Sequence, residues 1–335
     1  MVRIAILGMG FMGCTHYQAY RKAPGAQVTV IADRNPKRAQ GDLSGVWGNL
    51  GEGMPRQLPM DGLRGTTDLR APLTMDDVDV IDICLATPLH VEFAVAALEA
   101  GKHVICEKPL AASTAQAHPI LEAAAKAKGF FMPAMCMRFW PGWSWLKEAV
   151  RDGRWGRVLS ASFSRLASMP PGWFRQGDLS GGAAMDLHIH DTDFVHYLFG
   201  TPRAVTSRGY RRLSGRVDHL ATLYHYDQVP LVTAEGSWAL ADGFAFSMRY
   251  VVNFEEATAE FDLSRPQPLT VVRNGQAQAE PCPPGDGFEG ELAYFVNCVQ
   301  QNKRPAVVDA AQALESMRIV EAECQSIDTG RTVEL

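Results

Sequence analysis

The sequence predicts an α/β protein built from two domains. Through the first 130 residues, short apolar stretches alternate with helix-compatible stretches, a pattern typical of a doubly wound parallel sheet. Beyond residue 130, longer segments of alternating apolar and polar residues follow one another with few helices between them, which favours a large, mainly antiparallel open sheet. A chain of 335 residues is long enough for two domains of roughly 100–200 residues each. We therefore expect an α/β domain over residues 1–130 and an α+β domain over residues 131–335.

The composition is that of a globular protein acting on small molecules. Charged residues make up 21% of the chain and the net charge is −5, so there is no basic surplus of the kind that nucleic acid requires. No apolar run approaches the roughly 18 residues that span a membrane, and the first predicted strand begins at Val2, which leaves no room for a signal peptide. The seven cysteines are scattered without a C-x-x-C pair, so we expect reduced thiols and a cytoplasmic protein.

A glycine-rich turn follows the first predicted strand, residues 2–8, and opens a helix-compatible stretch to Ala23. In such a turn Gly8 permits the tight bend, Gly10 lets the backbone approach a pyrophosphate, and Gly13 allows the helix to pack against the strand. The N–H groups at the start of the helix attract phosphates. The pattern predicts a dinucleotide-binding domain of the Rossmann type, with cofactor contacts from Gly8, Gly10, Phe11, Met12 and Gly13.

A second strand, residues 27–33, ends on Asp33 about twenty residues after Gly13. A carboxylate at this position accepts a hydrogen bond from the adenosine ribose, which favours NAD. Three cations follow directly, and they could bind the 2′-phosphate of NADP or belong to a solvated turn before the next helix: Arg34, Lys37 and Arg38. We expect NAD as cofactor, with NADP use left open, and Asp33 and Arg34 near the ribose.

The third buried strand, residues 78–86, leads into a helix that ends at Gly101. Thr87, Pro88 and His90 open this helix, so we expect them beside the cofactor; for His90 an ordinary first-turn helix residue is an equal alternative. The segment 43–67 lacks periodicity and is rich in Gly, Pro and Met, which predicts an extended loop or a broken helix near the adenine side.

The run Glu107-Lys108-Pro109 follows the predicted strand 103–106, at the strand end where open α/β sheets bind ligands. Pro109 allows a cis Lys-Pro bond, which would aim the amine rigidly. We expect Glu107 and Lys108 at the cofactor, the alternative being a surface lysine in a turn. Pro119 then limits the next helix to residues 121–128, and residues 130–137 read as the last strand of the domain.

The second half of the chain contains seven segments with strand-like alternation. So broad a sheet leaves a face that a second copy would cover most simply, so we expect a homodimer or homotetramer. The predicted strands are residues 158–166, 204–210, 221–226, 229–238, 244–254, 258–263 and 269–272.

A helix predicted over residues 181–200 carries the second chemical signal. Asp186 and His190 are four residues apart and share one helix face, whereas His188 points about 160° away from His190. An H-x-H metal pair would need a strand, so no metal is expected. The Asp186/His190 pair is either a structural salt bridge or a proton carrier with its orienting carboxylate.

Three motifs, in this order and at these distances, resemble the Gfo/Idh/MocA family of glucose-fructose oxidoreductases and inositol dehydrogenases: the glycine-rich turn, the Glu107-Lys108-Pro109 run and the helix with Asp186 and His190. The resemblance runs the whole length and implies two C-terminal helices and a final strand. It further implies that Lys108 lies by the nicotinamide and the substrate alcohol, and that Asp186 and His190 supply acid-base chemistry. The Asp-x-x-x-His spacing is most similar to the inositol dehydrogenase branch. Segment 43–67, Pro119 and the Trp-rich run 138–145 depart from the family pattern.

We therefore expect an NAD(P)-dependent dehydrogenase acting on a secondary alcohol of a sugar, inositol or related polyol. Indole faces suit the apolar side of a sugar ring and guanidinium suits hydroxyls or a carboxylate, so four residues are candidates for the pocket wall, each with a core or surface position as alternative: Arg138, Trp140, Trp173 and Arg175. Two other functions remain open. An NAD-dependent glycoside hydrolase would act by transient oxidation and elimination with no net NADH, and a non-catalytic sugar sensor would not need both Lys108 and the Asp186/His190 pair.

Overall fold

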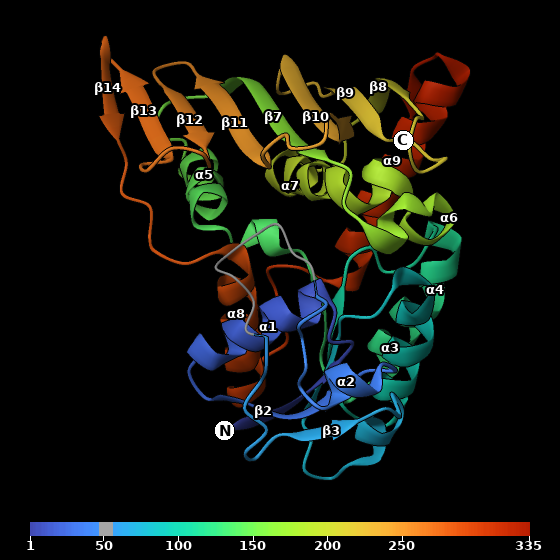
Figure 1. The fold of residues 1–335 in the computed structure, drawn as a ribbon. Coiled ribbons are helices and arrows are strands. Elements are labelled where there is room, and N and C mark those ends of the chain that lie inside the picture. The colour runs from blue at the N-terminus through green and yellow to red at the C-terminus, as the bar shows by residue number, and fades with distance from the viewer. Residues whose placement is uncertain (47–55) are drawn as a thin grey trace. The chain divides into compact units, whose positions relative to one another are not determined.

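The computed structural model describes residues 1–46 and 56–335 and divides the chain into two compact units (Figure 1). The first unit comprises Met1–Cys136 and Gly287–Leu314, and the second comprises Met137–Asp286 and Glu315–Leu335. This division differs from the predicted domains. Strand β6 (Phe131–Ala134) lies beyond the predicted boundary but pairs with β5 of the first sheet, and helix α8 (Gly287–Gln300) packs on α1 of the first unit.

The first unit contains a six-stranded sheet in the order β3-β2-β1-β4-β5-β6 with every pairing parallel. The strand order reverses between β1 and β4, which is the switch point where such sheets bind ligands. This is the predicted Rossmann-type sheet. Its strands are β1 (Val2–Leu7), β2 (Ala26–Ala32), β3 (Arg64–Thr66), β4 (Val80–Ile83), β5 (His103–Glu107) and β6.

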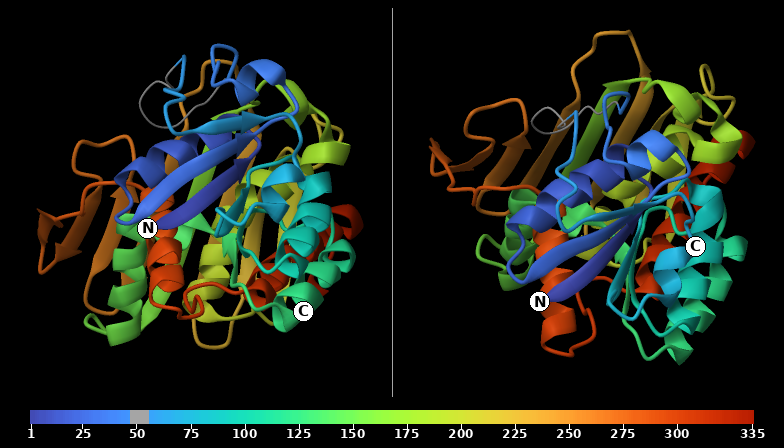
Figure 2. Two further views of the ribbon diagram at one scale, coloured as in Figure 1. Left: turned by 90° about the horizontal axis from the view of Figure 1, so that it is seen from below. Right: turned by 60° about the horizontal axis from the view of Figure 1, so that its bottom comes forward.

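Helices flank the first sheet, with α1 beside α8 and α3 beside α4 (Figure 2). Their bounds are α1 (Phe11–Lys22), α2 (Pro36–Ala39), α3 (His90–Glu99), α4 (Thr114–Lys126) and α8. The prediction of a helix over 121–128 was wrong at its start, because α4 begins at Thr114 and contains Pro119. Pro119 lies early in the helix, where a single intrahelical hydrogen bond is lost, and the buried Ala117 and Ile120 anchor the turn around it.

The predicted segment 43–67 lies partly outside the described residues. Within the described part, Asp42 and Gln57 form an isolated antiparallel bridge and β3 pairs with β2. The rest of that prediction, over residues 47–55, stays outside the described residues.

The second unit is built on a nine-stranded sheet in the order β14-β13-β12-β11-β7-β10-β9-β8-β15. β7 and β10 pair in parallel and the other pairings are antiparallel, as predicted. All seven predicted strands are present, together with two short ones. The strands are β7 (Val158–Ser168), β8 (Ala204–Tyr210), β9 (His219–His225), β10 (Leu231–Leu240), β11 (Ser247–Phe254), β12 (Thr258–Asp262), β13 (Leu269–Arg273), β14 (Gln276–Ala279) and β15 (Val333–Glu334).

Helices α5 (Pro141–Asp152) and α7 (Ile189–Phe199) lie against one face of this sheet (Figure 1). The Trp-rich run, for which no helix was predicted, begins α5 and contributes to the core. The buried Trp143 packs edge-on against Tyr250 and Phe261, at ring-centroid distances of 4.9 and 4.6 Å. Helix α9 (Ala310–Thr329) and β15 complete the chain, as the family resemblance implies. Among the described residues, no helix combines the length and apolar character needed to cross a membrane.

Candidate active site

The glycine-rich turn has the geometry that its sequence predicts. Gly8 has a φ of +93°, and a Cβ there would lie 2.5 Å from the carbonyl oxygen of Cys84. A Cβ at Gly13 would lie 1.8 Å from the carbonyl oxygen of Gly8, so both positions exclude a side chain. A Cβ at Gly10 would meet nothing within 4 Å. The turn is therefore tightly packed on its inner side and open at Gly10, where the start of α1 presents Phe11 and Met12, each partly exposed.

Asp33 ties the end of β2 to this turn. Its Oδ2 accepts a hydrogen bond from the Met9 N–H at 2.7 Å, and its Oδ1 accepts from the Asn35 N–H at 2.8 Å. Of the following cations, Arg38 lies 3.8 Å from Asp33, whereas Arg34 is exposed. The carboxylate is therefore positioned next to the glycine-rich turn, with a guanidinium beside it.

His90 has a different role from the expected cofactor contact. Its side chain is buried, with Nδ1 2.7 Å from the Pro109 carbonyl oxygen and Nε2 2.9 Å from the Leu85 carbonyl oxygen. Burial lowers the pKa of His90, against the raising influence of the two carbonyls. Through these two contacts, His90 connects the segments that follow β4 and β5. Thr87 beside it is buried and Pro88 is exposed.

Lys108 follows directly on β5, and the Lys108-Pro109 bond is cis, as the sequence allows. Its side chain is partly exposed between buried neighbours. Glu107, expected beside the cofactor, instead points into the interior: it is 5% exposed, and its Oε2 accepts from the Lys108 N–H at 3.1 Å. The strand alternation explains this difference, because adjacent residues at the end of β5 face opposite ways. Lys108 is thus the residue of this turn that can reach a ligand.

A buried polar cluster that sequence reasoning missed lies behind this turn. His16 of α1 is fully buried, with Nδ1 2.9 Å from Asp82 Oδ2 of β4 and Nε2 3.1 Å from Glu107 Oε1. Glu291 Oε1 of α8 lies 3.9 Å from Nε2, and the Cys84 Sγ lies 3.3 Å from Nδ1. Two signals in the sequence could have revealed it: a histidine three residues after Gly13, and an aspartate inside an apolar strand.

Charge complementarity sets the protonation of this cluster. Burial acts to lower the pKa of His16, but the charges and hydrogen bonds of Asp82 and Cys84 together outweigh burial, and the pKa lies well above the ordinary histidine value. Burial acts to raise the pKa of Glu107, yet the hydrogen bond and charge of His16 hold it below its ordinary value. Among the described residues, two groups of donors lie close enough together to be considered for a metal ion, and both contain His16: His16, Asp82 and Cys84, and His16, Glu107 and Glu291.

In the second unit, Asp186 and His190 occupy corresponding positions on successive turns. Asp186 belongs to a π-helical turn, Ala184–His188, which runs straight into α7, so the predicted helix over 181–200 has a wider first turn. Asp186 and His190 are each partly exposed, whereas the three residues between them are buried. π-turns of this kind are found frequently at functional sites. Both residues are therefore partly accessible to solvent.

His188 faces the other way, as predicted. It is fully buried, and its Nε2 lies 3.3 Å from Glu323 Oε2 and 3.3 Å from the Tyr224 hydroxyl. His188 and His190 therefore differ in exposure, His188 being buried and His190 partly exposed.

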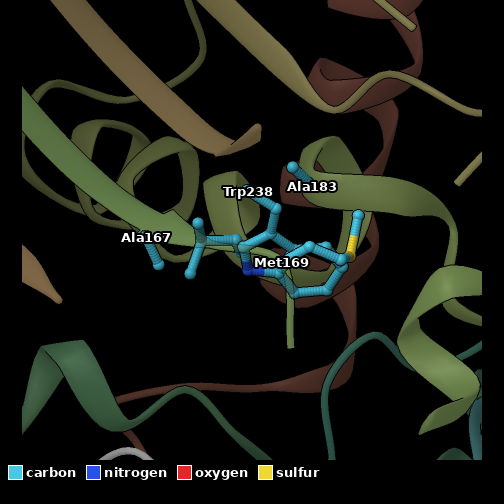
Figure 3. Packing of buried hydrophobic residues seen from close by; sticks show 5 residues of the cluster. Ala167, Met169, Ala183 and Trp238 are labelled. Atoms are coloured by element: carbon cyan, nitrogen blue, oxygen red, sulfur yellow. The ribbon is translucent and has the colours of Figure 1, made fainter. Parts of the chain in front are cut away.

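The π-turn rests on an apolar cluster that includes Ala183, Leu187 and Trp238 (Figure 3). Phe174 packs against the same cluster, and Trp173 stacks on Phe174 at 4.5 Å between ring centroids. Trp173 is partly exposed and Arg175 is exposed. Both remain candidates for the pocket wall.

The other two candidates for the pocket wall are buried. Arg138 is 3% exposed, and it binds Asp193 of α7 through Nε–Oδ2 and Nη2–Oδ1 contacts of 2.9 and 2.7 Å. Its guanidinium also lies 4.6 Å from the Tyr197 ring centroid. Trp140 is buried. Arg138 therefore links the start of the second unit to α7 through a buried ion pair with Asp193.

Comparison with known proteins agrees with this geometry. A family model described as "Oxidoreductase family, NAD-binding Rossmann fold" matches residues 2–135, and one described as "Oxidoreductase family, C-terminal alpha/beta domain" matches residues 147–335. The fold and the glycine-rich turn thus define an NAD-binding oxidoreductase. The chain belongs to the Gfo/Idh/MocA oxidoreductase family.

Similar proteins act on sugars and inositols. Levoglucosan dehydrogenase from Pseudarthrobacter phenanthrenivorans is 31% identical over 221 residues, which are 62% of this chain and 53% of that protein, so the match spans about half of that relative. The scyllo-inositol 2-dehydrogenase (NADP(+)) of Bacillus subtilis is 27% identical over 90% of each chain. A solved levoglucosan dehydrogenase, in complex with NADH and levoglucosan, superimposes with a TM-score of 0.85 at 23% identity over 99% of both chains, which shows a shared fold.

Proposed function

We propose that this oxidoreductase transfers a hydride between NAD(P) and a secondary alcohol of a sugar, inositol or related polyol. The observation that carries the proposal is the combination of two chemical groups on this family's scaffold. One is the partly exposed amine of Lys108 at the end of β5, and the other is the partly exposed Asp186/His190 face. Three of the similar proteins are a xylose dehydrogenase and two inositol dehydrogenases, which supports the same substrate class here.

The cofactor fits the first unit. Gly10 is open where a pyrophosphate approaches, and the first-turn N–H groups of α1 are available to phosphate oxygens. When bound, NAD(P) supplies the hydride acceptor for alcohol oxidation. The overall reaction converts the secondary alcohol and NAD(P)⁺ to a ketone, NAD(P)H and a proton.

The chain's own residues handle the proton and the oxygen. His190 accepts the hydroxyl proton, and Asp186 orients the imidazole and stabilises the imidazolium that forms. Lys108 donates a hydrogen bond to the oxygen as it becomes an alkoxide and then a carbonyl. Trp173 offers an aromatic face for the apolar side of a ring, and Arg175 offers donors for hydroxyls.

A substrate panel tests this proposal. The protein is incubated with NAD or NADP and one of a series of aldoses, anhydrosugars, inositols and linear polyols, and NAD(P)H is followed at 340 nm. We expect reduction of the cofactor with at least one cyclic polyol. Cofactor binding without reduction by any member of the panel would favour a sensor over an enzyme.

Cofactor preference provides a prediction for Asp33. Asp33→Ala should lower the ratio of kcat/KM with NAD to kcat/KM with NADP, because the change removes a repulsive carboxylate beside Arg34 and Arg38. The KM for NAD should rise as well, since the variant loses the hydrogen bonds from the Met9 and Asn35 N–H groups. Asp42→Ala, a change at a partly exposed acid outside the turn, serves as the control. An unchanged NAD/NADP ratio in Asp33→Ala would place the ribose elsewhere.

We also propose that the second unit mediates self-association through the open face of its sheet. The pairing registers place Leu231, Val251 and Val272 on one face, where they are 48%, 44% and 42% exposed. On the opposite face, Tyr250 and its neighbours are buried. Exposed apolar residues on one face of a wide sheet favour burial of that face against a second copy.

The expected result is a dimer or tetramer by light scattering at micromolar concentration. Val251→Glu should lower the measured mass to that of a smaller species, because the interface would have to bury a carboxylate. Leu179→Glu, at an exposed apolar residue away from the sheet, should leave the mass unchanged. A parent protein that scatters as a monomer would contradict the proposal.

A further inference from the structure

Neither the stability of the fold nor the proposed reaction by itself explains the buried cluster behind Lys108. Isolated charges are costly to bury, and here one histidine and three carboxyl groups lie together with at most 5% exposure. They come from four different elements: His16 from α1, Asp82 from β4, Glu107 from β5 and Glu291 from α8. A core that only needed to be stable would favour apolar residues at these positions.

Carboxyl groups surround the His16 ring. Nδ1 makes a hydrogen bond with Asp82 Oδ2 at 2.9 Å, whereas Nε2 lies 3.1 Å from Glu107 Oε1 and 3.9 Å from Glu291 Oε1 without the alignment of a hydrogen bond. Three carboxyl groups within 4 Å of the two ring nitrogens favour the charged form of the ring. His16 is therefore an imidazolium paired with Asp82 and Glu107. The groups facing it are Asp82, Glu107, Glu291 and the Cys84 thiol.

The two oxygens of Glu107 connect this bridge to the active-site turn. Oε1 lies against the His16 ring, and Oε2 accepts from the backbone N–H of Lys108. On the other side of Lys108, the Pro109 carbonyl oxygen lies 2.7 Å from His90 Nδ1. The backbone on both sides of Lys108 is thus fixed by buried side chains, while its own side chain is partly exposed.

We propose that His16 is a positioning residue for Lys108: its imidazolium holds the Glu107 carboxylate, which in turn fixes the backbone from which the Lys108 amine projects. The inference rests on the proposed role of Lys108 in alcohol oxidation. A metal ion bound by the same donors is the competing explanation, and the elemental analysis described below tests it.

His16→Gln tests the proposal, because it keeps a polar side chain and removes the charge. We expect kcat to fall about 10- to 100-fold, since misplacement of a catalytic group by about 1 Å has effects of that size. The Kd for NAD should change less than about threefold, because the glycine-rich turn is untouched. His103→Gln is the matched control: His103 lies at the other end of β5 and accepts the Phe130 N–H at 3.0 Å, so its loss should leave kcat unchanged.

A double-mutant cycle separates positioning from a general loss of structure. If His16 acts through Lys108, His16→Gln should cause no further loss of residual rate in a Lys108→Ala background. Multiplicative losses in the double variant would show that His16 acts independently and would overturn the proposal. A parent-like kcat in His16→Gln, with Lys108→Ala inactive, would overturn this inference alone. A fully active Lys108→Ala would instead overturn the role of Lys108 in the proposed function.

Measurements on the unaltered protein keep the proposal testable if the variant does not fold. Nitrogen NMR of histidine-labelled protein should show one buried ring with both nitrogens protonated at pH 8, where an ordinary histidine is neutral. Elemental analysis should find no stoichiometric metal. If every buried histidine is neutral at pH 8, or if one metal ion per chain is found and its removal alters kcat, the imidazolium bridge is refuted.

The raised pKa of His16 also fixes the pH dependence of its contribution to stability. Because the folded pKa lies above the unfolded value of about 6.5, the contribution is fully present below that value and is lost as pH rises through the folded pKa. The difference in unfolding free energy between parent and His16→Gln should therefore shrink on the alkaline side. A difference that grows with pH would contradict an imidazolium at this site.

Discussion

Lys108→Ala is expected to remove all but a small residual turnover while the affinity for NAD stays within a few-fold of the parent. Removal of one donor that stabilises a developing oxyanion costs about 10²–10³-fold in rate, and the cis-Pro turn gives this amine a fixed origin. The phosphates are assigned to the glycine-rich turn, which the substitution leaves unchanged. Stopped-flow or steady-state rates together with NAD titration by fluorescence measure the two effects separately.

The control for this variant is Lys128→Ala, which removes an exposed lysine elsewhere in the same unit. It should retain the parent rate. If NAD affinity collapses together with turnover in Lys108→Ala, Lys108 belongs to cofactor binding and the alkoxide must be stabilised by another group.

The second large effect is expected at the acid-base face. If His190 is the base for alcohol oxidation, it must be neutral in the productive complex, so kcat/KM should rise with pH through one ionisation near the ordinary histidine value of about 6.5 or modestly above it. His190→Asn should remove this inflection and lower the rate by about 10²–10⁴-fold, the usual range for a positioned proton carrier.

Asp186 determines the direction in which the profile moves. A neighbouring carboxylate stabilises the imidazolium, so Asp186→Asn should shift the inflection to lower pH and lower the plateau rate. The matched control is His196→Asn on the same helix, whose Nδ1 lies 3.3 Å from Ser316 Oγ. It should leave the inflection in place. A His190→Asn variant that keeps both its rate and its pH profile would show that the pair is structural.

The parts of this fold that could be predicted from the sequence are those with a local cause. Gly8 and Gly13 have the conformations and close approaches that their spacing predicts, and Lys108 lies at the end of β5 because an apolar strand stops there. The alternation of strands such as β11 is equally local, since Met248, Tyr250 and Val252 are buried and the residues between them are not.

The parts that could not be predicted depend on partners far away in the sequence. His16 bridges residues 66 and 91 positions later, and nothing near it indicates that Asp82 and Glu107 will meet its two nitrogens. Arg138 is a residue type suited to binding a substrate, but Asp193, 55 residues away, accepts hydrogen bonds from its Nε–Nη2 edge. Helix α8 packs on α1 although the chain forms a whole second sheet between them.

Segment-level errors have a similar origin. Pro119 argues against a helix on local grounds, but burial of Ala117 and Ile120 outweighs the lost hydrogen bond. The π-turn at Ala184–His188 has no clear periodicity signal, because it differs from an α-helical turn by a single residue.

The central claim, hydride transfer from a carbinol carbon, is tested most directly by following deuterium. The best substrate from the panel, labelled with deuterium on the carbon to be oxidised, is converted with unlabelled NAD or NADP, and ketone and reduced cofactor are quantified by mass spectrometry. We predict equal amounts of ketone and reduced cofactor, with one deuterium on the nicotinamide ring of each reduced molecule. Release of a free sugar without net NAD(P)H, or appearance of the deuterium in water instead of in the cofactor, would contradict the proposed reaction and favour elimination chemistry on the same scaffold.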